Sequence, residues 1–223
     1  TYNITASIHI PKNNVSLRGN GNATILKRMY NSTSGDTARG LITLNGKSGC
    51  KIQGLQIDGN KATYASSYNY GIYLYSSSNN TVTGNTCNNN IDGISLYASS
   101  DNNTITGNTC NNNDYGIYLD SSSNNTVTGN TCNNNDNGIR LDSSSNNTVT
   151  GNTCSNNNRR GIDLFSSCNN TITGNTCNNN SNIGIDLYSS SNNTVTGNNC
   201  NNNNYGIRLL SSSNNNTVTG NTC

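Results

Sequence analysis

From residue 79 onward, apolar and polar residues follow one pattern that returns every 22 or 23 residues. The stretch NNTVTGNTCNNNDNGIRLDSSS of residues 124–145 is typical of it. Within each unit apolar and polar residues alternate, as in TVT of residues 126–128 and GIRL of residues 138–141. Alternation with a period of two predicts β-strands, and a fixed repeat of this length predicts a solenoid.

Two kinds of solenoid have repeats of this length. Leucine-rich repeats need several leucines and often a helical segment, whereas Asn, Gly, Ser and Thr, which form helices poorly, fill these units. We therefore predict an all-β fold in which each unit is one coil of a parallel β-helix, with strands at G-I-x-L, T-V-T and N-T-C. Coils about 4.8 Å apart would give roughly nine or ten coils and a length of about 45 Å.

The repeat extends upstream in a looser form. Residues 49–60, GCKIQGLQIDGN, overlay the unit with Ile52 at the Val position and Ile57 at the Cys position. We predict one continuous solenoid domain, with irregular N-terminal coils and two insertions in residues 1–70 and regular repeats in residues 71–223.

Several of these segments resemble a known family. The repeat NNTITGNTCNNNDYGIYLDSSS and the upstream segments VSLRGNGNATIL and LQIDGN resemble right-handed parallel β-helix proteins of the pectin-lyase-like superfamily. The likeness is greatest to Asn-rich surface β-helices of methanogenic archaea and to the periplasmic β-helix of nitrous-oxide-reductase maturation. It implies a right-handed parallel β-helix over nearly the whole chain and, by analogy with archaeal envelopes, a component of a proteinaceous sheath. A shared scaffold indicates fold more than function.

Cysteine recurs at one position of the unit. This column comprises Cys87, Cys110, Cys132, Cys154, Cys177, Cys200 and Cys223. No C-x-x-C occurs and the one histidine is His9, so we expect no metal site and no cofactor. Stacked cysteines would lie within the Cα range of a disulfide, but in-register parallel strands aim their Cβ atoms the same way. Two interpretations therefore remain open. The thiols are buried in place of Ile, or they form disulfides between coils or from Cys223 to another chain.

Asparagine recurs at one corner of the unit. The column comprises Asn85, Asn108, Asn130, Asn152, Asn175, Asn198 and Asn221. Stacked Asn amides can hydrogen-bond to each other along a fibre axis, and Asn tolerates the left-handed backbone of a tight corner. We therefore predict a structural asparagine ladder, in which the side chains hydrogen-bond along the axis and the backbones form the corner.

The outward positions of the G-I-x-L strands vary most from unit to unit. The candidate lateral or ligand face comprises Tyr73, Tyr75, Tyr97, Tyr118, Arg140, Asp163, Phe165, Asp186, Tyr188 and Arg208. Exposed aromatic residues on a flat face indicate packing against another molecule. The resemblance places the carboxylates of Asp120/Asp142 and Asp163/Asp186 where pectin-active relatives keep acids and calcium ligands, although pairing with arginine is the alternative. The polygalacturonase-like G-H-G motif is absent, and no catalytic residue is assigned.

Two further features suggest binding surfaces. The threonines of the T-x-T strands, such as Thr126 and Thr128, form two ladders similar to the ice-binding faces of antifreeze solenoids, although Thr also suits any exposed strand. Insertions at residues 27–39 and 61–70 should leave the same corner of adjacent coils. Insertions in repeat proteins often mark a binding face, so they are either a glycan site or a flap over the first coils. The candidate glycan residues are Arg28, Arg39, Lys61, Tyr64 and Tyr68.

Charge and composition exclude some classes of function. Charged residues are 10% of the 223 and the net charge is +2, too small to indicate a nucleic-acid partner. Residues 1–61 carry eight Lys and Arg against two Asp, and the remainder four Arg against eight Asp, so the N-terminal part is basic and the rest acidic. No apolar run is long enough to span a membrane.

We therefore expect a non-catalytic structural protein that is extracellular or at the cell surface and self-assembles into a filament or sheath. Neither end shows the polar cap of a soluble solenoid, so either the chain is a fragment of a longer solenoid or neighbouring copies cover its ends. We favour the second, and expect copies to stack head to tail and to pack laterally, with glycans as further partners. The alternatives are a glycan-binding or polysaccharide-degrading β-helix, with a lyase or hydrolase as the enzyme, and an ice-binding solenoid.

Overall fold

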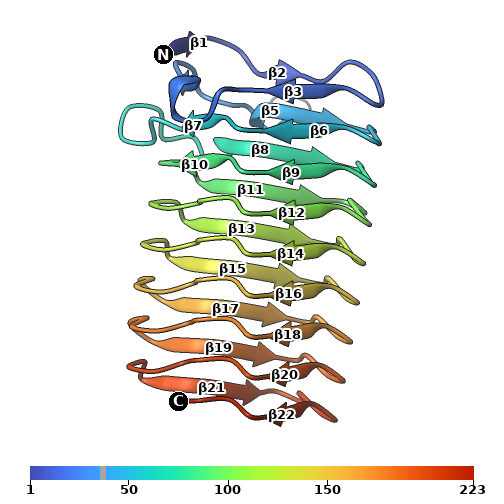
Figure 1. Ribbon diagram of the computed structural model, residues 1–223, viewed down its shortest axis with the longest axis vertical. Helices are drawn as coiled ribbons and strands as arrows, with labels where there is room; N and C mark the ends of the chain where they lie inside the picture. Colours follow the sequence, from blue (N-terminus) through green and yellow to red (C-terminus); the bar gives the residue numbers. More distant parts are fainter. Residues whose placement is uncertain (36–38) are drawn as a thin grey trace.

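Each repeat closes one turn of a solenoid, and the turns stack along a single axis (Figure 1). The computed structural model describes residues 1–35 and 39–223. It is a right-handed parallel β-helix of about nine coils, which confirms the predicted fold class. Three parallel sheets run along the axis, here called sheets A, B and C.

Sheet B is built from the G-I-x-L segments and has the longest strands. Its nine strands, in order along the axis, are β2 (Ile8–His9), β5 (Gly40–Asn45), β8 (Tyr70–Tyr75), β11 (Asp92–Tyr97), β13 (Tyr115–Asp120), β15 (Asn137–Asp142), β17 (Arg160–Phe165), β19 (Ile183–Tyr188) and β21 (Tyr205–Leu210). The regular strands begin one residue before the glycine and run for six residues.

Sheet C is built from the T-V-T segments. Its nine strands are β3 (Ser16–Arg18), β6 (Lys51–Gln53), β9 (Thr81–Thr83), β12 (Thr104–Thr106), β14 (Thr126–Thr128), β16 (Thr148–Thr150), β18 (Thr171–Thr173), β20 (Thr194–Thr196) and β22 (Thr217–Thr219). Both threonine ladders lie on its outward face, in register from β9 to β22.

Sheet A is short. It has the four strands β1 (Tyr2–Ile4), β4 (Ile25–Arg28), β7 (Gln56–Asp58) and β10 (Thr86–Asn88), and the short 3-10 helix η1 (Gly21–Ala23) precedes β4. In later coils the predicted N-T-C strand is wrong, because only one residue per coil forms a bridge, as in Thr109↔Thr131. The left-handed residues on either side do not cause this, because β10 has them at the same spacing, Gly84 (φ 61°) and Asn89 (φ 60°), and still pairs over three residues with β7.

The core is one stack of identical layers. A regular coil turns Val127, Cys132, Ile139 and Leu141 inward, each with no exposed surface. Strand pairing places like on like, for example Ile117 on Ile139. Burial of each large aliphatic side chain contributes about 1.5–3 kcal/mol, and this repeats in every layer.

The corners of a regular coil contain one arrangement four times, two of them between sheets B and C: a residue in left-handed conformation followed by a buried polar side chain. Gly129 (φ 61°) precedes the ladder residue Asn130 in this way. The expectation that the ladder asparagines themselves adopt the left-handed backbone is therefore wrong. Reversal of the chain at the preceding residue turns the next side chain inward, and this conformation costs glycine little.

The two insertions leave the same corner, between sheets A and B, as predicted. They also contact each other: Ser32 N donates to Asn69 Oδ1 (2.7 Å) and Ser66 Oγ donates to the Ser32 carbonyl (2.7 Å). Residues 36–38 of the first insertion lie outside the described residues. Arg28, a predicted glycan residue, is fully buried and donates to Ser32 Oγ (2.7 Å) and to the Tyr70 carbonyl. That assignment is wrong, because the insertions fold over this side chain. In the described part of the chain no helix is long and apolar enough to cross a membrane.

Candidate functional site

The outward face of sheet B carries most of the aromatic and charged side chains of the regular coils. One outward column runs in register over six consecutive strands, from β8 to β19, and we call it the outer strip. It comprises Tyr75, Tyr97, Asp120, Asp142, Phe165 and Tyr188. All six side chains are at least partly exposed, so the strip is an accessible row of planar groups one coil apart.

Tyrosines crowd around the N-terminal end of the strip. The ring centroid of Tyr73 lies 6.1 Å from that of Tyr75 and 6.4 Å from that of Tyr97. Arg39, from the first insertion, stacks over Tyr97 at 5.8 Å and over Tyr68 at 5.0 Å. These contacts, together with Tyr70, cover Tyr73 completely. The prediction that Tyr73 belongs to an accessible face is therefore wrong, although its side chain does leave the sheet on the outward side.

The next pair of rings lies on β13. Tyr115 and Tyr118 stack with centroids 5.1 Å apart and planes 25° apart. Tyr118 OH donates to Asp120 Oδ2 (3.4 Å), and Ser121 Oγ donates to Asp120 Oδ1 (2.9 Å). Burial raises the pKa of Tyr115 and of Tyr118, so both phenols stay protonated at neutral pH and can donate hydrogen bonds.

Beside the C-terminal half of the strip lies a ladder of ion pairs. Arg140 contacts Asp163 at 2.8 Å and Asp142 at 2.9 Å, whereas Asp186 contacts Arg160 and Arg208, each at 2.8 Å. The side chains of Asp163 and Asp186 are only 3% and 1% exposed. The prediction that they face a ligand is wrong, and the predicted alternative is confirmed: Arg140 pairs with Asp163 and Arg208 with Asp186, so guanidinium groups cover these carboxylates. Burial raises the pKa of Asp163, and Arg160 and Arg140 oppose this shift.

The last two positions of the outer strip are aromatic. The rings of Phe165 and Tyr188 stack with centroids 5.2 Å apart and planes 5° apart, and the two residues are 38% and 37% exposed. Arg140 lies 5.5 Å from the centre of the Phe165 ring. The outer strip therefore reads along the axis as two rings, two carboxylates and two rings.

Sequence reasoning missed one buried acid beside this face. Asp92, at the start of β11, is 2% exposed and is close in space to the ion pair of Lys61 and Asp114. Burial raises the pKa of Asp92 to about 7; Asp114 and Asp120 act in the same direction, whereas the nearby Ser95 side chain and the charge of Lys61 oppose it. The weak signal was an acid directly before Gly93, where other coils have Tyr, Asn, Arg or Ile. Tyr64, from the same insertion as Lys61, is partly exposed.

The cysteine column lies in the core. Its members from Cys87 to Cys200 are buried, Cys223 is exposed, and all nine cysteines of the chain are free thiols in this structure. A Cβ atom built on Gly116 would approach Cys132 Cβ to 2.9 Å, so the layer has room for a side chain as small as Cys. Cys50 takes the place of a corner asparagine, and its backbone N–H donates to Asn80 Oδ1 (2.9 Å).

The asparagine ladder lies inside its corner. Asn152 Nδ2 donates to Asn175 Oδ1 (3.0 Å) and to the Val127 carbonyl (2.9 Å). Two more asparagine columns, beginning at Asn80 and Asn90, make similar contacts at the other corners. Sequence reasoning missed these columns, because buried and exposed asparagines alternate there in the same N-N runs.

Comparison with protein families and solved structures places this geometry among known β-helices. The model of the family described as "Periplasmic copper-binding protein (NosD)" matches residues 53–223. No match was found among curated proteins. The Dettilon tailspike protein is similar with a TM-score of 0.74 and 16% identity over 100% of this chain and 54% of its own. The periplasmic alginate epimerase AlgG has a TM-score of 0.60 and 21% identity over 79% of this chain and 54% of its own.

A third structure, the A-module of the Azotobacter vinelandii mannuronan C-5 epimerase AlgE4, has a TM-score of 0.65 and 15% identity over 99% of this chain and 86% of its own. The chain thus spans about half of the tailspike and AlgG chains. At these identities the likenesses show the fold alone, and they confirm the resemblance to right-handed parallel β-helix proteins. Since the family model covers most of the chain, including all the regular coils, this protein is a member of the NosD family.

Proposed function

We propose that this chain is an exported polysaccharide-binding protein and that the outer strip of sheet B contacts the glycan. The observation that carries the proposal is the order of the strip: half-exposed rings and carboxylates in register on six consecutive strands. Sugar rings offer C–H faces that pack on aromatic rings and hydroxyls that hydrogen-bond to carboxylates. Tyrosine serves both needs, because it has an apolar body and a polar tip.

The length of the strip suits a polymer. Strands about 4.8 Å apart place Tyr75 and Tyr188 about 24 Å apart along the axis, enough for several linked sugars. Rigid strands hold the rings, so little side-chain entropy is lost on binding. An extended chain lying along the solenoid would meet rings at both ends and the carboxylates of Asp120 and Asp142 between them.

The comparisons support the same class of ligand and location. AlgG is described as a periplasmic alginate epimerase, AlgE4 as a mannuronan epimerase and the NosD family as periplasmic. This support is analogy of fold, which carries function weakly. It agrees with a protein that works outside the cytoplasm, at the cell surface or in the extracellular space.

Affinity electrophoresis against a panel of soluble polysaccharides, followed by calorimetry with the best oligosaccharide, tests the proposal. Tyr97→Ala and Phe165→Ala should each weaken binding about tenfold or more, as for aromatic anchors of an interface. Thr128→Ala, on the opposite sheet, is the control and should leave affinity unchanged. Equal binding by all three variants, or no binding by the native chain, would exclude the outer strip as the glycan surface.

Asp92 favours an enzyme as the second candidate. A carboxyl group with a pKa of about 7 can exchange a proton near neutral pH, and perturbed carboxyl groups cluster at functional sites. Tyr115 lies beside it on the adjacent strand. Incubation with polyuronides, followed by absorbance of unsaturated products and by reducing ends, tests for a lyase or hydrolase. Activity in the native chain that Asp92→Asn abolishes would establish this function.

A structural role is the third candidate. The stacked pair Phe165 and Tyr188 is exposed and could pack laterally against another copy, as in the predicted filament or sheath. Native molecular mass measured against concentration, with and without reductant, tests this. A concentration-dependent polymer that Phe165→Ser disperses would support it, and a monomer at high concentration would refute it.

Copper, named in the family description, is not part of this proposal. In the described residues no group of three or more His, Cys, Asp or Glu side chains is arranged to hold a metal ion. The column cysteines from Cys87 to Cys200 are buried in the core, where apolar surroundings oppose the thiolate that a metal needs. The single histidine, His9, lies on β2 away from that column. The side chains therefore do not fit a copper centre.

A further inference from the structure

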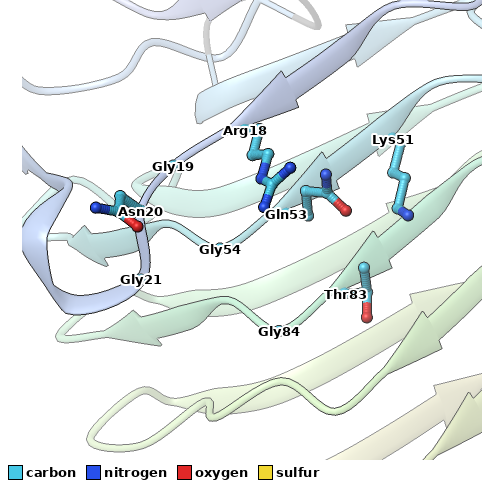
Figure 2. Close-up of a pocket in the computed structure, with 9 residues that line it drawn as sticks. All are labelled: Arg18, Gly19, Asn20, Gly21, Lys51, Gln53, Gly54, Thr83 and Gly84. Carbon is cyan, nitrogen blue, oxygen red and sulfur yellow. The ribbon is translucent and has the colours of Figure 1, made fainter.

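A groove crosses the outward face of sheet C where the N-terminal coils meet the regular repeats (Figure 2). Its volume is about 500 Å³, and residues of three consecutive coils line it. Inward residues of sheets B and C share one core, as Val82 and Ile94 do. The groove therefore lies on the side of the solenoid opposite to the outer strip.

Glycines make the floor of the groove. A Cβ atom built on Gly19 would lie 2.3 Å from the Gly54 carbonyl oxygen, so the backbones of these two coils touch without side chains between them. Gly84, on the next coil, has φ +61° and faces open space, since a Cβ there would meet no atom within 4 Å. The depression thus follows from the glycines after β3, β6 and β9, of which Gly54 and Gly84 are left-handed, a conformation that costs glycine little.

The walls are hydrogen-bond donors. Arg18, Gln53 and Thr83 form one column in register on β3, β6 and β9, and Lys51 stands in the column beside it. Figure 2 shows these four side chains projecting from the strands, with Gly19, Gly54 and Gly84 beside them along the backbone. Arg18 and Lys51 are exposed. Among the described residues the ion pairs involve Lys61, Arg140, Arg160 and Arg208, so neither groove cation is neutralised by a carboxylate.

The backbone of the floor offers no free donor. Gly19 N donates to the Gln53 carbonyl (2.9 Å), Gly21 N to the Gly54 carbonyl (2.8 Å) and Gly54 N to the Thr83 carbonyl (3.3 Å). Recognition must therefore come from side chains: a guanidinium, an ammonium, a hydroxyl and the amides of Gln53 and Asn20. Guanidinium and ammonium groups only donate hydrogen bonds, and their charge-assisted bonds to carboxylate or phosphate oxygens are the strong ones. The groove is thus built for an oxyanion.

The surroundings of the groove indicate what carries the oxyanion. Beyond Lys51 and Arg18 the outward positions of sheet C are threonine hydroxyls with no charge, from Thr81 on β9 to Thr219 on β22. A nucleic acid needs a long row of cations for its phosphates, which this face lacks. A hydroxyl-rich ligand with sparse negative charge fits better, and the volume of the groove is within the range of small-molecule sites, about 300–1,000 Å³.

We propose that this groove is a subsite for the carboxylate, sulfate or phosphate group of an acidic glycan, held by Arg18 and Lys51 with Gln53 and Thr83 completing the shell. Both cations precede residue 53, where the NosD match begins, so the charged half of the site comes from outside the matched repeats. The proposal concerns a different face from the outer strip and does not depend on it.

The test compares the native chain with the double variant Arg18→Gln/Lys51→Gln by calorimetry with oligogalacturonate, a sulfated oligosaccharide and a neutral oligosaccharide. At least one acidic ligand should bind, and the neutral one more weakly. The double variant should lower the acidic affinity about tenfold or more, since one charge-assisted hydrogen bond is worth roughly that factor. Added salt should weaken native binding. Lys12→Gln, an exposed cation outside the groove, is the matched control and should change affinity less than about twofold.

Several results would overturn the proposal. Undiminished binding by the double variant, with native circular dichroism, would show that the groove is not the site. Inorganic phosphate or anionic phosphatidylglycerol vesicles bound as tightly as the acidic glycan would refute a sugar ligand. Loss of binding with Tyr97→Ala but not with the double variant would exclude the groove and leave the outer strip. Loss with the double variant but not with Tyr97→Ala would support the groove while the outer strip failed.

Discussion

Replacement of Asn152 by alanine should test whether the asparagine ladder stabilises the solenoid. Asn152 Oδ1 accepts from the backbone N–H (2.9 Å) and the Nδ2 (3.0 Å) of Asn130 in the preceding coil. Its own Nδ2 donates to the Val127 carbonyl (2.9 Å) and to Asn175 Oδ1 (3.0 Å). The residue is 1% exposed, so water cannot replace these partners without rearrangement.

The magnitude follows from the groups left without partners. Alanine keeps the backbone bond from Asn152 N to Asn175 Oδ1 (2.9 Å), and Asn130 Nδ2 keeps the Ile105 carbonyl (2.9 Å). Two groups, the Asn130 N–H and the Val127 carbonyl, lose these side-chain bonds. A buried polar group without a partner costs about 1–3 kcal/mol, so we expect a loss of about 2–6 kcal/mol. That is a large share of a typical unfolding free energy of about 5–15 kcal/mol.

Urea unfolding followed by far-ultraviolet circular dichroism measures this loss, with a thermal scan as a second probe. Asn158→Ala is the control, because Asn158 is exposed and a surface change should cost less than about 0.5 kcal/mol. Repeat proteins can unfold in steps, so the transition of the central coils is the relevant one. A difference between the two variants below about 1 kcal/mol would refute a stabilising role for the ladder.

Three further changes test the core and the buried acid. Gly116→Ala puts a Cβ atom 2.5 Å from the Gly138 carbonyl oxygen and should lower the free energy of unfolding by about 3 kcal/mol. Gly129→Ala faces open space, and its left-handed backbone (φ +61°) should cost only about 1–2 kcal/mol. Equal urea midpoints for the two variants would contradict this. Cys132→Ser buries a hydroxyl in a fully buried position and should cost about 1–3 kcal/mol in the same assay, so no loss would argue against a core role for the thiol. Asp92 holds its proton more tightly when folded, since burial raises its pKa to about 7; this contribution to stability is present below about pH 4 and lost as the pH rises through about 7. Relative to the native chain, Asp92→Asn should therefore gain up to about 4 kcal/mol between pH 4 and pH 8, and a pH-independent difference would show that Asp92 titrates normally.

Much of the fold could be predicted because the same alternation of apolar and polar residues recurs in every repeat. Alternation in TVT and GIRL places Val127, Ile139 and Leu141 inward, and the upstream match of Ile57 to the cysteine position places Cys132 inward as well. The corners were harder to predict, because asparagine has two different roles there. In an N-N pair such as Asn79 and Asn80, the first residue adopts the left-handed backbone and the second is buried. The letters are the same, and only the backbone geometry separates their roles.

The accessible face was predicted less well. The columns of sheet B were assigned correctly to the outward side, but being outward did not make Tyr73, Asp163 or Asp186 accessible. Their cover comes from other coils and from Arg39 of an insertion. Asp92 was missed for the same reason, since its environment is made by residues distant in the chain, such as Lys61 and Asp120.

The coil length, the all-β class and the inward apolar side chains followed from the sequence alone, because a period of two within a period of 22 or 23 is a local property of the chain. Three features emerged only in the folded molecule: which outward groups meet solvent, which carboxylates pair with arginine, and that Arg18, Lys51 and Thr83 share one groove. These features depend on how the coils stack. The register of the parallel strands brings residues from different repeats into contact, and that register decides which side chains are covered and which charges pair.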